Sequence, residues 1–303
     1  MGNRNTKTKK MLLKKHCFLF LVLFSVFWGG CNNIIVPPIE TNYQSMDKSP
    51  AWSPDGKWIA YSHFNRNVND SLYPTGLYII DTNGTNKRML IAGNVDSPDW
   101  PPDGKQIVFT NGSIFIIDIN TKQINQLTNN GSDFFPSWSP DGIKISFDRS
   151  GTSDTVGTWI FNILTHTQNR LGLFPQLDWS QTGNQIVYSE KSENKNSESQ
   201  IWSAISDGTS QQELTSNNFS YNRYPKWSSA SNKIAWEILL NNTVYPEVWI
   251  MNSDGSNQIK LIDGSYPCWS PDNTRIVYSK PGGNKIALFI IDIKTKVMHQ
   301  LTF

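Results

Sequence analysis

The side chains that could perform catalysis are few and lie far apart in the sequence. The chain contains three cysteines and four histidines. A histidine acts as general base or metal ligand only where partner groups converge on it, but His63, His166 and His299 fall at unrelated places in the repeating pattern of the chain. The carboxylates of Glu190 and Glu193 lie in "SEKSENKNSES", a stretch typical of a solvated loop. We therefore expect no catalytic residue, no metal site and no cofactor.

A motif that occurs six times accounts for most of the chain. Copies such as "SPAWSPDGKWIAYS" contain a Trp, a Ser-Pro-Asp-Gly turn and an apolar segment. The steps between the six Trp are 48, 38, 41, 48 and 42 residues. The Trp residues are Trp52, Trp100, Trp138, Trp179, Trp227 and Trp269. A period in the low forties is expected where each repeat forms one propeller blade.

Each copy predicts four antiparallel strands joined by short turns. An isoleucine seven residues after the Trp and an aromatic residue nine after it lie on one face of a second strand. A third strand carries another aromatic residue and a fourth carries a leucine. Such sheets, apolar on both faces, bury those faces by stacking radially on one another. The sequence thus predicts an all-β fold, a six-bladed β-propeller with four antiparallel strands per blade, over residues 49–303.

The residue directly before each Trp is expected to line the inner edge of the propeller. Asp99, Asp178 and Lys226 occupy this position and are candidates for facing the central channel. A cation or a peptide terminus could bind beside them, and a solvated ion pair is the alternative interpretation. Cys268 occupies the same position in the sixth copy, where we interpret it as a small strand residue.

The loops predicted on one face of the propeller differ widely between copies. The segment after the second strand is "HFNRNVNDSLYPTG" in the first copy and "NGS" in the second. Variable loops on a rigid scaffold are common places for binding, and large aromatic rings suit the recognition of proteins or sugars. The alternative is that these rings cover the ends of blades. The candidate binding residues on this loop face are Phe64, Tyr73, Phe134, Phe219, Tyr221 and Tyr245.

The first thirty residues are of a different kind. Several lysines precede the apolar run "CFLFLVLFSVFW", which is too short to span a bilayer and is followed by small residues. This order is typical of a secretory signal peptide over residues 1–30. The segment holds six basic and no acidic residues, so the remainder has 21 basic against 25 acidic residues. No excess of positive charge is left to indicate a nucleic-acid partner.

The end of this segment, "GGC", resembles a bacterial lipoprotein signal. In that family the Cys after a small residue is lipidated and becomes the mature N-terminus. The resemblance implies lipidation at Cys31 and an exported protein anchored in the cell envelope, on the periplasmic side of the outer membrane. Cleavage without lipid attachment is the alternative. Residues 31–48 predict a tether, and whether it adds a strand to the ring stays open.

The repeat itself resembles that of the TolB-like β-propeller family over about residues 49–303. TolB is the periplasmic component of the Tol–Pal envelope system and has an α/β domain ahead of its propeller, where this chain has only a short tether. We therefore do not expect this chain to bind the partners of TolB in the Tol–Pal system. Similar repeats occur in propellers attached to peptidases and in some polysaccharide lyases, so the fold alone does not decide the activity.

We interpret the chain as a non-enzymatic envelope lipoprotein that binds a protein partner, with its membrane contact made through the lipid. The alternative is a glycan-binding or carbohydrate-active propeller in polysaccharide uptake. A third hypothesis is an envelope component without a discrete ligand.

Overall fold

The computed structural model describes residues 43–67, 72–191, 198–217, 220–230, 232–240, 243 and 245–303. The predicted signal peptide, Cys31 and residues 32–42 of the predicted tether lie outside the described residues, as does Phe219. In the described part of the chain all regular structure is β-strand, and no helix long and apolar enough to cross a membrane occurs there.

Each of the six sequence repeats forms four consecutive strands. The first repeat forms β1 (Ser45–Trp52), β2 (Trp58–Asn65), β3 (Gly76–Asp81) and β4 (Arg88–Ala92), and the second forms β5 (Asp96–Asp99), β6 (Gln106–Thr110), β7 (Ile114–Asp118) and β8 (Ile124–Gln126). The third forms β9 (Asp133–Trp138), β10 (Lys144–Arg149), β11 (Gly157–Asn162) and β12 (Thr167–Gly172), and the fourth forms β13 (Asp178–Trp179), β14 (Gln185–Lys191), β15 (Ser199–Ile205) and β16 (Gln212–Glu213). The fifth forms β17 (Ser220–Trp227), β18 (Lys233–Leu240), β19 (Glu247–Asn252) and β20 (Ile259–Asp263), and the sixth forms β21 (Ser265–Trp269), β22 (Arg275–Gly282), β23 (Lys285–Asp292) and β24 (Met298–Gln300).

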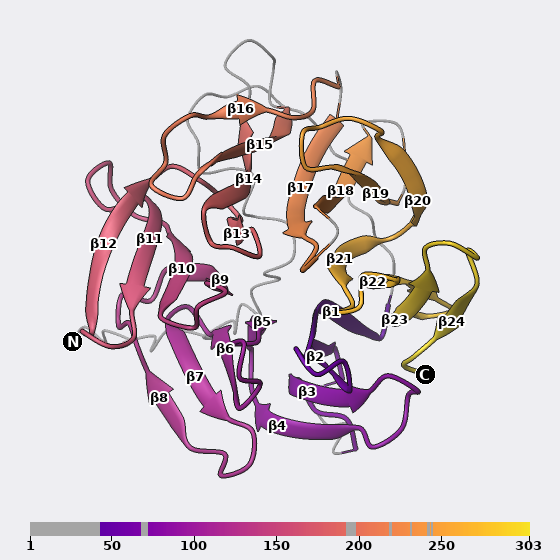
Figure 1. Cartoon of the computed structure of the whole chain (residues 1–303). Coiled ribbons are helices and arrows are strands. Elements are labelled where there is room, and N and C mark those ends of the chain that lie inside the picture. Colours follow the sequence, from indigo (N-terminus) through magenta and orange to yellow (C-terminus); the bar gives the residue numbers. More distant parts are fainter. Residues whose placement is uncertain are drawn as a thin grey trace, which may run out of the picture. The chain divides into compact units, whose positions relative to one another are not determined.

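The strands of one repeat pair antiparallel in chain order, so each repeat is a meander. The second and third repeats are separate four-stranded sheets, while short parallel pairings of β1 with β23 and of β15 with β17 join the others into two eight-stranded sheets. Figure 1 shows the meanders arranged around a common centre, with the first strand of each innermost and the fourth outermost. The prediction of an all-β fold built from four-stranded antiparallel sheets is confirmed.

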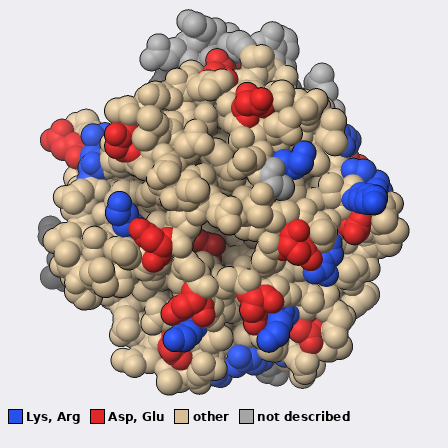
Figure 2. Space-filling model, viewed as in Figure 1, with Lys and Arg blue, Asp and Glu red and all other residues tan. Residues whose placement is uncertain are grey.

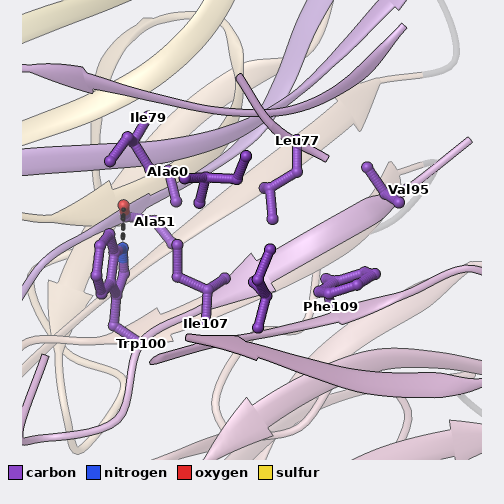
Figure 3. Close-up of a cluster of buried hydrophobic side chains, with 10 residues drawn as sticks. Ala51, Ala60, Leu77, Ile79, Val95, Trp100, Ile107 and Phe109 are labelled. Carbon is purple, nitrogen blue, oxygen red and sulfur yellow. Dashed lines mark hydrogen bonds between the residues drawn. The ribbon is translucent and has the colours of Figure 1, made fainter. Parts of the chain in front are cut away.

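Apolar side chains of neighbouring meanders form the core. Between the first two repeats, Leu77 and Ile107 are fully buried, and Trp100 closes the inner end of the cluster (Figure 3). The indole Nε1 of Trp100 donates a hydrogen bond to the carbonyl of Ala51, at 3.1 Å. Trp100 therefore joins its own meander to the preceding one, as does Trp269 through the carbonyl of Lys226 at 3.0 Å, and both bury a large apolar surface.

The first strand begins inside the segment predicted to be a tether. Ser45 pairs in parallel with Lys285 of β23, and the backbone N–H of Gln44 donates to the carbonyl of Asn284 at 2.8 Å. Residues just before the first repeat therefore connect the first repeat to the last.

Candidate functional site

The segments that precede the six repeat Trp surround a central cavity of about 70 Å³. Residues from every repeat contribute to its lining. Figure 2 shows that one face of the molecule is hollowed at its centre, with acidic atoms visible inside the hollow. Two layers of side chains form the wall of this cavity. Each layer is defined by the number of residues that separate it from the repeat Trp in the sequence.

The residue three positions before each Trp has a left-handed backbone conformation. Its φ lies between 50° and 57° in all six repeats. These residues, called the bulge layer here, are Ser49, Ser97, Phe135, Gln176, Tyr224 and Tyr266. None is a glycine, so each conformation costs on the order of 1 kcal/mol. In five repeats the register between first and second strand shifts at this point, as in a β-bulge, which redirects the side chain of the bulged residue.

All six residues of the bulge layer line the cavity. Three of them are aromatic, and their rings meet although they come from different repeats. The ring centroids of Tyr224 and Tyr266 are 4.6 Å apart, and those of Phe135 and Tyr224 are 5.8 Å apart. Gln176 supports this group because its Oε1 accepts a hydrogen bond from the backbone N–H of Tyr224, at 2.8 Å.

The residue directly before each Trp forms the second layer, called the Trp-adjacent layer. It contains the three predicted channel residues, and the structure brings them together: Asp99 and Lys226 line the cavity, and Asp178 Oδ1 lies 3.0 Å from Lys226 Nζ. Both carboxylates also bind the backbone of the following repeat. Asp99 accepts a hydrogen bond from the N–H of Trp138 and Asp178 from that of Trp227, each at 2.7 Å.

The surroundings of these groups change their protonation. Burial raises the pKa of Asp99 to about 6; the charge of Lys226 opposes this shift and that of Asp178 adds to it. Burial lowers the pKa of Lys226, but the charges of Asp178 and Asp99 outweigh burial and raise it above its ordinary value. Lys226 is therefore protonated at neutral pH. Burial also raises the pKa of the Cys268 thiol, to about 11, so the thiol is not ionised there.

The aromatic residues predicted for the loop face occupy two kinds of position. Tyr73 and Tyr245 lie in bends between strands and are 45% and 41% exposed. The loop prediction was wrong for Phe64, Phe134 and Tyr221, which lie in β2, β9 and β17 and are half-buried. The reason is that the first and second strands stay paired nearly to the link between repeats, as in the pairing of Met46 with Phe64.

Sequence reasoning missed a pair of buried polar residues on neighbouring strands. His63, predicted for a loop, lies in β2, where its Nδ1 is 2.6 Å from Asp47 Oδ1 and both side chains are buried. The third repeat has Arg149 and Asp133 at the same repeat positions, joined by hydrogen bonds of 2.6 and 2.9 Å. The sequence pattern that could have revealed these pairs is an acidic residue five positions before the repeat Trp and a basic residue eleven positions after it.

The other candidates for chemistry stay apart. His166 lies in the turn before β12 and His299 in β24, while Glu190 lies in β14 and Glu193 is outside the described residues. Among the residues whose placement is described, no group of three or more histidine, cysteine or acidic side chains could hold a metal ion.

Comparison with known proteins gives the family of the chain. No curated protein sequence matches it. Among solved structures, TolB from Acinetobacter baumannii has a TM-score of 0.66 and 20% identity, over 83% of this chain and 62% of that one, so this chain spans less than two thirds of that protein. The putative TolB from Agrobacterium tumefaciens has a TM-score of 0.62 and 20% identity, over 75% and 87% of the two chains.

An enzyme shares the fold as well. An oligogalacturonate lyase, solved in complex with manganese, has a TM-score of 0.56 and 11% identity, over 86% of this chain and 79% of that one. At these identities the likeness concerns the fold alone. The family described as TolB beta propeller domain matches residues 30–197 and, in an overlapping match, residues 77–303. The chain therefore belongs to the TolB beta propeller domain family.

Proposed function

We propose that the six meanders are the blades of one six-bladed propeller, and that this propeller is a non-enzymatic scaffold for a protein partner. The partner binds to the loop face, where the links between repeats and the loops after the second strands lie. The observation that carries this proposal is the exposure of the aromatic rings of Tyr73 and Tyr245 on loops of a rigid all-β framework. Such rings dominate the binding energy of many protein interfaces.

The charged groups of the channel support a scaffold better than an enzyme. Asp99 and Asp178 are engaged by backbone N–H groups of the next repeat, and Asp178 is also paired with Lys226. A general acid or base must be free to reach a substrate, whereas these carboxylates hold neighbouring meanders together.

The proposal places the scaffold in the cell envelope, exported by the signal of residues 1–30 and anchored through a lipid on Cys31. The support is the basic, apolar and "GGC" order of that segment. Mass spectrometry of the mature protein from membranes tests this part: a lipidated Cys31 at its N-terminus supports the anchor. A mature N-terminus elsewhere, without lipid, would refute it.

Photo-crosslinking in intact cells tests the scaffold. A photoreactive amino acid is placed at Tyr73 or at Tyr245, the exposed tyrosines of the loop face, and adducts are identified by mass spectrometry. We expect one dominant protein adduct, shared by both positions.

The matched control carries the same group at Leu164, which is 71% exposed in the turn between β11 and β12, on the opposite face. A protein adduct equally abundant from Leu164 would refute binding through the loop face. So would the absence of any protein adduct from folded, membrane-attached protein.

A further inference from the structure

The first and sixth repeats meet without a chain link between them, because they are not consecutive in the sequence. In each of the other five junctions, the chain runs from the fourth strand of one repeat into the first strand of the next. Noncovalent contacts alone hold the remaining junction, called the closing seam here. They include the parallel pairing of Ser45 with Lys285 and the hydrogen bond from the N–H of Gln44 to the carbonyl of Asn284.

The junction between the fourth and fifth repeats is a matched counterpart of the closing seam, because β15 and β17 also pair in parallel there. The backbone N–H of Trp227 donates to Asp178 at this junction, at 2.7 Å. At the closing seam the corresponding N–H, that of Trp52, donates to the sulfur of Cys268 at 3.4 Å. A hydrogen bond to a carboxylate is roughly twice as strong as a neutral one, and a thiol sulfur is a weak acceptor. The closing seam is therefore held less strongly at this point.

The hairpin of the first repeat also lacks a contact that other hairpins make. A Cβ placed on Gly104 would lie 3.3 Å from Pro54 in the hairpin of the preceding repeat, and one on Gly142 would lie 3.4 Å from Pro102. At the same position of the first repeat, Gly56, such a Cβ would have no atom of the described chain within 4 Å beyond the adjacent residues. The closing seam thus has open space beside Gly56 where other junctions are packed.

Apolar packing across the closing seam makes the closed form dominant. Tyr61 and Ile80 of the first repeat lie in one buried cluster with Leu288 and Ile290 of the sixth. Separation of the two repeats exposes these side chains to water, which costs free energy. An open form is therefore a minor state in exchange with the closed one, as in the sub-global opening of other native proteins.

The closing seam is also part of the wall of the central cavity. Ser49 and Ala51 line the cavity from the first repeat, and Tyr266 and Cys268 line it from the sixth. We propose that the propeller opens at the closing seam, by separation of the first repeat from the sixth, and that this opening gives lateral access to the central cavity. The opening does not require the protein partner of the loop face, so the two proposals are tested independently.

Labelling of Cys268 in the full-length protein with fluorescein-5-maleimide tests the opening, because this reagent is much larger than a cavity of about 70 Å³. A disulfide from Ser45→Cys and Lys285→Cys locks the closing seam, since paired residues of neighbouring strands lie close enough for this bond. The matched control joins Ser199→Cys to Tyr221→Cys between β15 and β17. Mass spectrometry confirms each disulfide and follows the label on Cys268. We expect the lock to slow labelling at least tenfold and the control disulfide to leave the rate within about twofold of the wild type.

A second pair of variants loosens the closing seam without a cross-link. Gln44→Pro removes the N–H that binds the carbonyl of Asn284, so labelling of Cys268 should become about fivefold faster, as expected for the loss of one neutral hydrogen bond. Gln44→Ala keeps this N–H and should label at the wild-type rate. Thermal unfolding of each variant shows that it is folded.

Three results would overturn the proposal. The first is that Cys268 of the folded wild type is not labelled at all. The second is that the two disulfides change the labelling rate equally, which would mean that the reagent enters by another route. The third is that Gln44→Pro labels no faster than Gln44→Ala, and this comparison decides alone if the locked variant does not fold.

Discussion

Two layers of the same inner wall, two residues apart in each repeat, use their side chains in different ways. In the Trp-adjacent layer, Asp99 and Asp178 point their carboxylates at the backbone of the next repeat. In the bulge layer, the ring of Tyr224 lies against those of Phe135 and Tyr266 in the lining of the cavity instead. The first layer holds meanders together, and the second presents a surface.

The two layers differ in how the side chains suit the backbone around them. Both layers repeat six times, so both are part of the framework. In the Trp-adjacent layer, Asp99 and Asp178 accept hydrogen bonds from backbone N–H groups of the neighbouring repeat. The residues of the bulge layer have a positive φ, a strained conformation that costs an L-residue free energy. Glycine would adopt the same conformation without this strain.

The largest effect is expected from Asp178→Ala. This change leaves the N–H of Trp227 and the ammonium of Lys226 without their partner, so we expect a loss of about 2–3 kcal/mol in the free energy of unfolding, measured with urea. The control Asp103→Ala removes an exposed hairpin carboxylate that accepts from the N–H of Lys105, and should cost less than about 1 kcal/mol. Equal losses in the two variants would contradict a stabilising role of the Trp-adjacent layer.

A smaller effect concerns pH and Asp99. Its pKa is raised to about 6 in the folded protein from an ordinary value of 3.8, so the folded state holds this proton more tightly than the unfolded state. Stability due to this group is therefore highest below about pH 4 and falls as the pH rises to about 6. Because the side chain is only half-buried, we expect a loss of about 1–2 kcal/mol.

Asp99→Asn removes this contribution while keeping an acceptor for the N–H of Trp138. Unfolding measured at pH 4 and at pH 7 should therefore show a smaller decline for the variant than for the wild type. Burial raises the pKa of Asp148 to about 7. Asp148 therefore contributes to the loss of stability between pH 4 and pH 7 in the wild type and in the variant alike. Identical pH profiles would show that Asp99 titrates normally.

A still smaller effect is expected from Tyr266→Gly. Glycine adopts the φ of 52° found at this residue without strain, which offsets part of the lost ring packing. We expect a net change within about 1 kcal/mol in unfolding free energy, with Tyr266→Ala less stable than Tyr266→Gly by about 1 kcal/mol. If Tyr266→Gly were as damaging as Asp178→Ala, the bulge layer would have to be counted as a structural layer.

The smallest effect is expected from Cys268→Ser. The sulfur of Cys268 accepts a hydrogen bond from the backbone N–H of Trp52 at 3.4 Å. Asp99 and Asp178 accept the corresponding hydrogen bonds in their repeats, and the sulfur is a weaker acceptor than a carboxylate. A serine oxygen can replace it, and the unfolding free energy should change by less than about 1 kcal/mol. A larger change would mean that the thiol has a role beyond this contact.

The sequence predicted well what depends on residues near one another in the chain. The turns after Trp52, Trp100 and Trp269 have the left-handed residue that the turn motif predicts: Gly56 and Gly104 have φ of 73° and 64°, and Asn273 takes the same region at 58°. The ends of strands were predicted less well. β2 runs on through His63 and Phe64 because Asp47 and Met46, which look like tether residues in the sequence, pair with them.

By itself, the sequence determined the number of repeats, the four strands of each repeat, and the Trp and isoleucine positions that are buried between meanders. These follow from local alternation and turn chemistry, which need no knowledge of distant residues. Only the tertiary structure decided which side chains share the cavity. Tyr224 meets Phe135 from a repeat two places away, and Lys48 reaches Asp96 of the next repeat. Such neighbours arise when meanders arranged around one centre bring their inner strands together, a proximity that no spacing within a single repeat encodes.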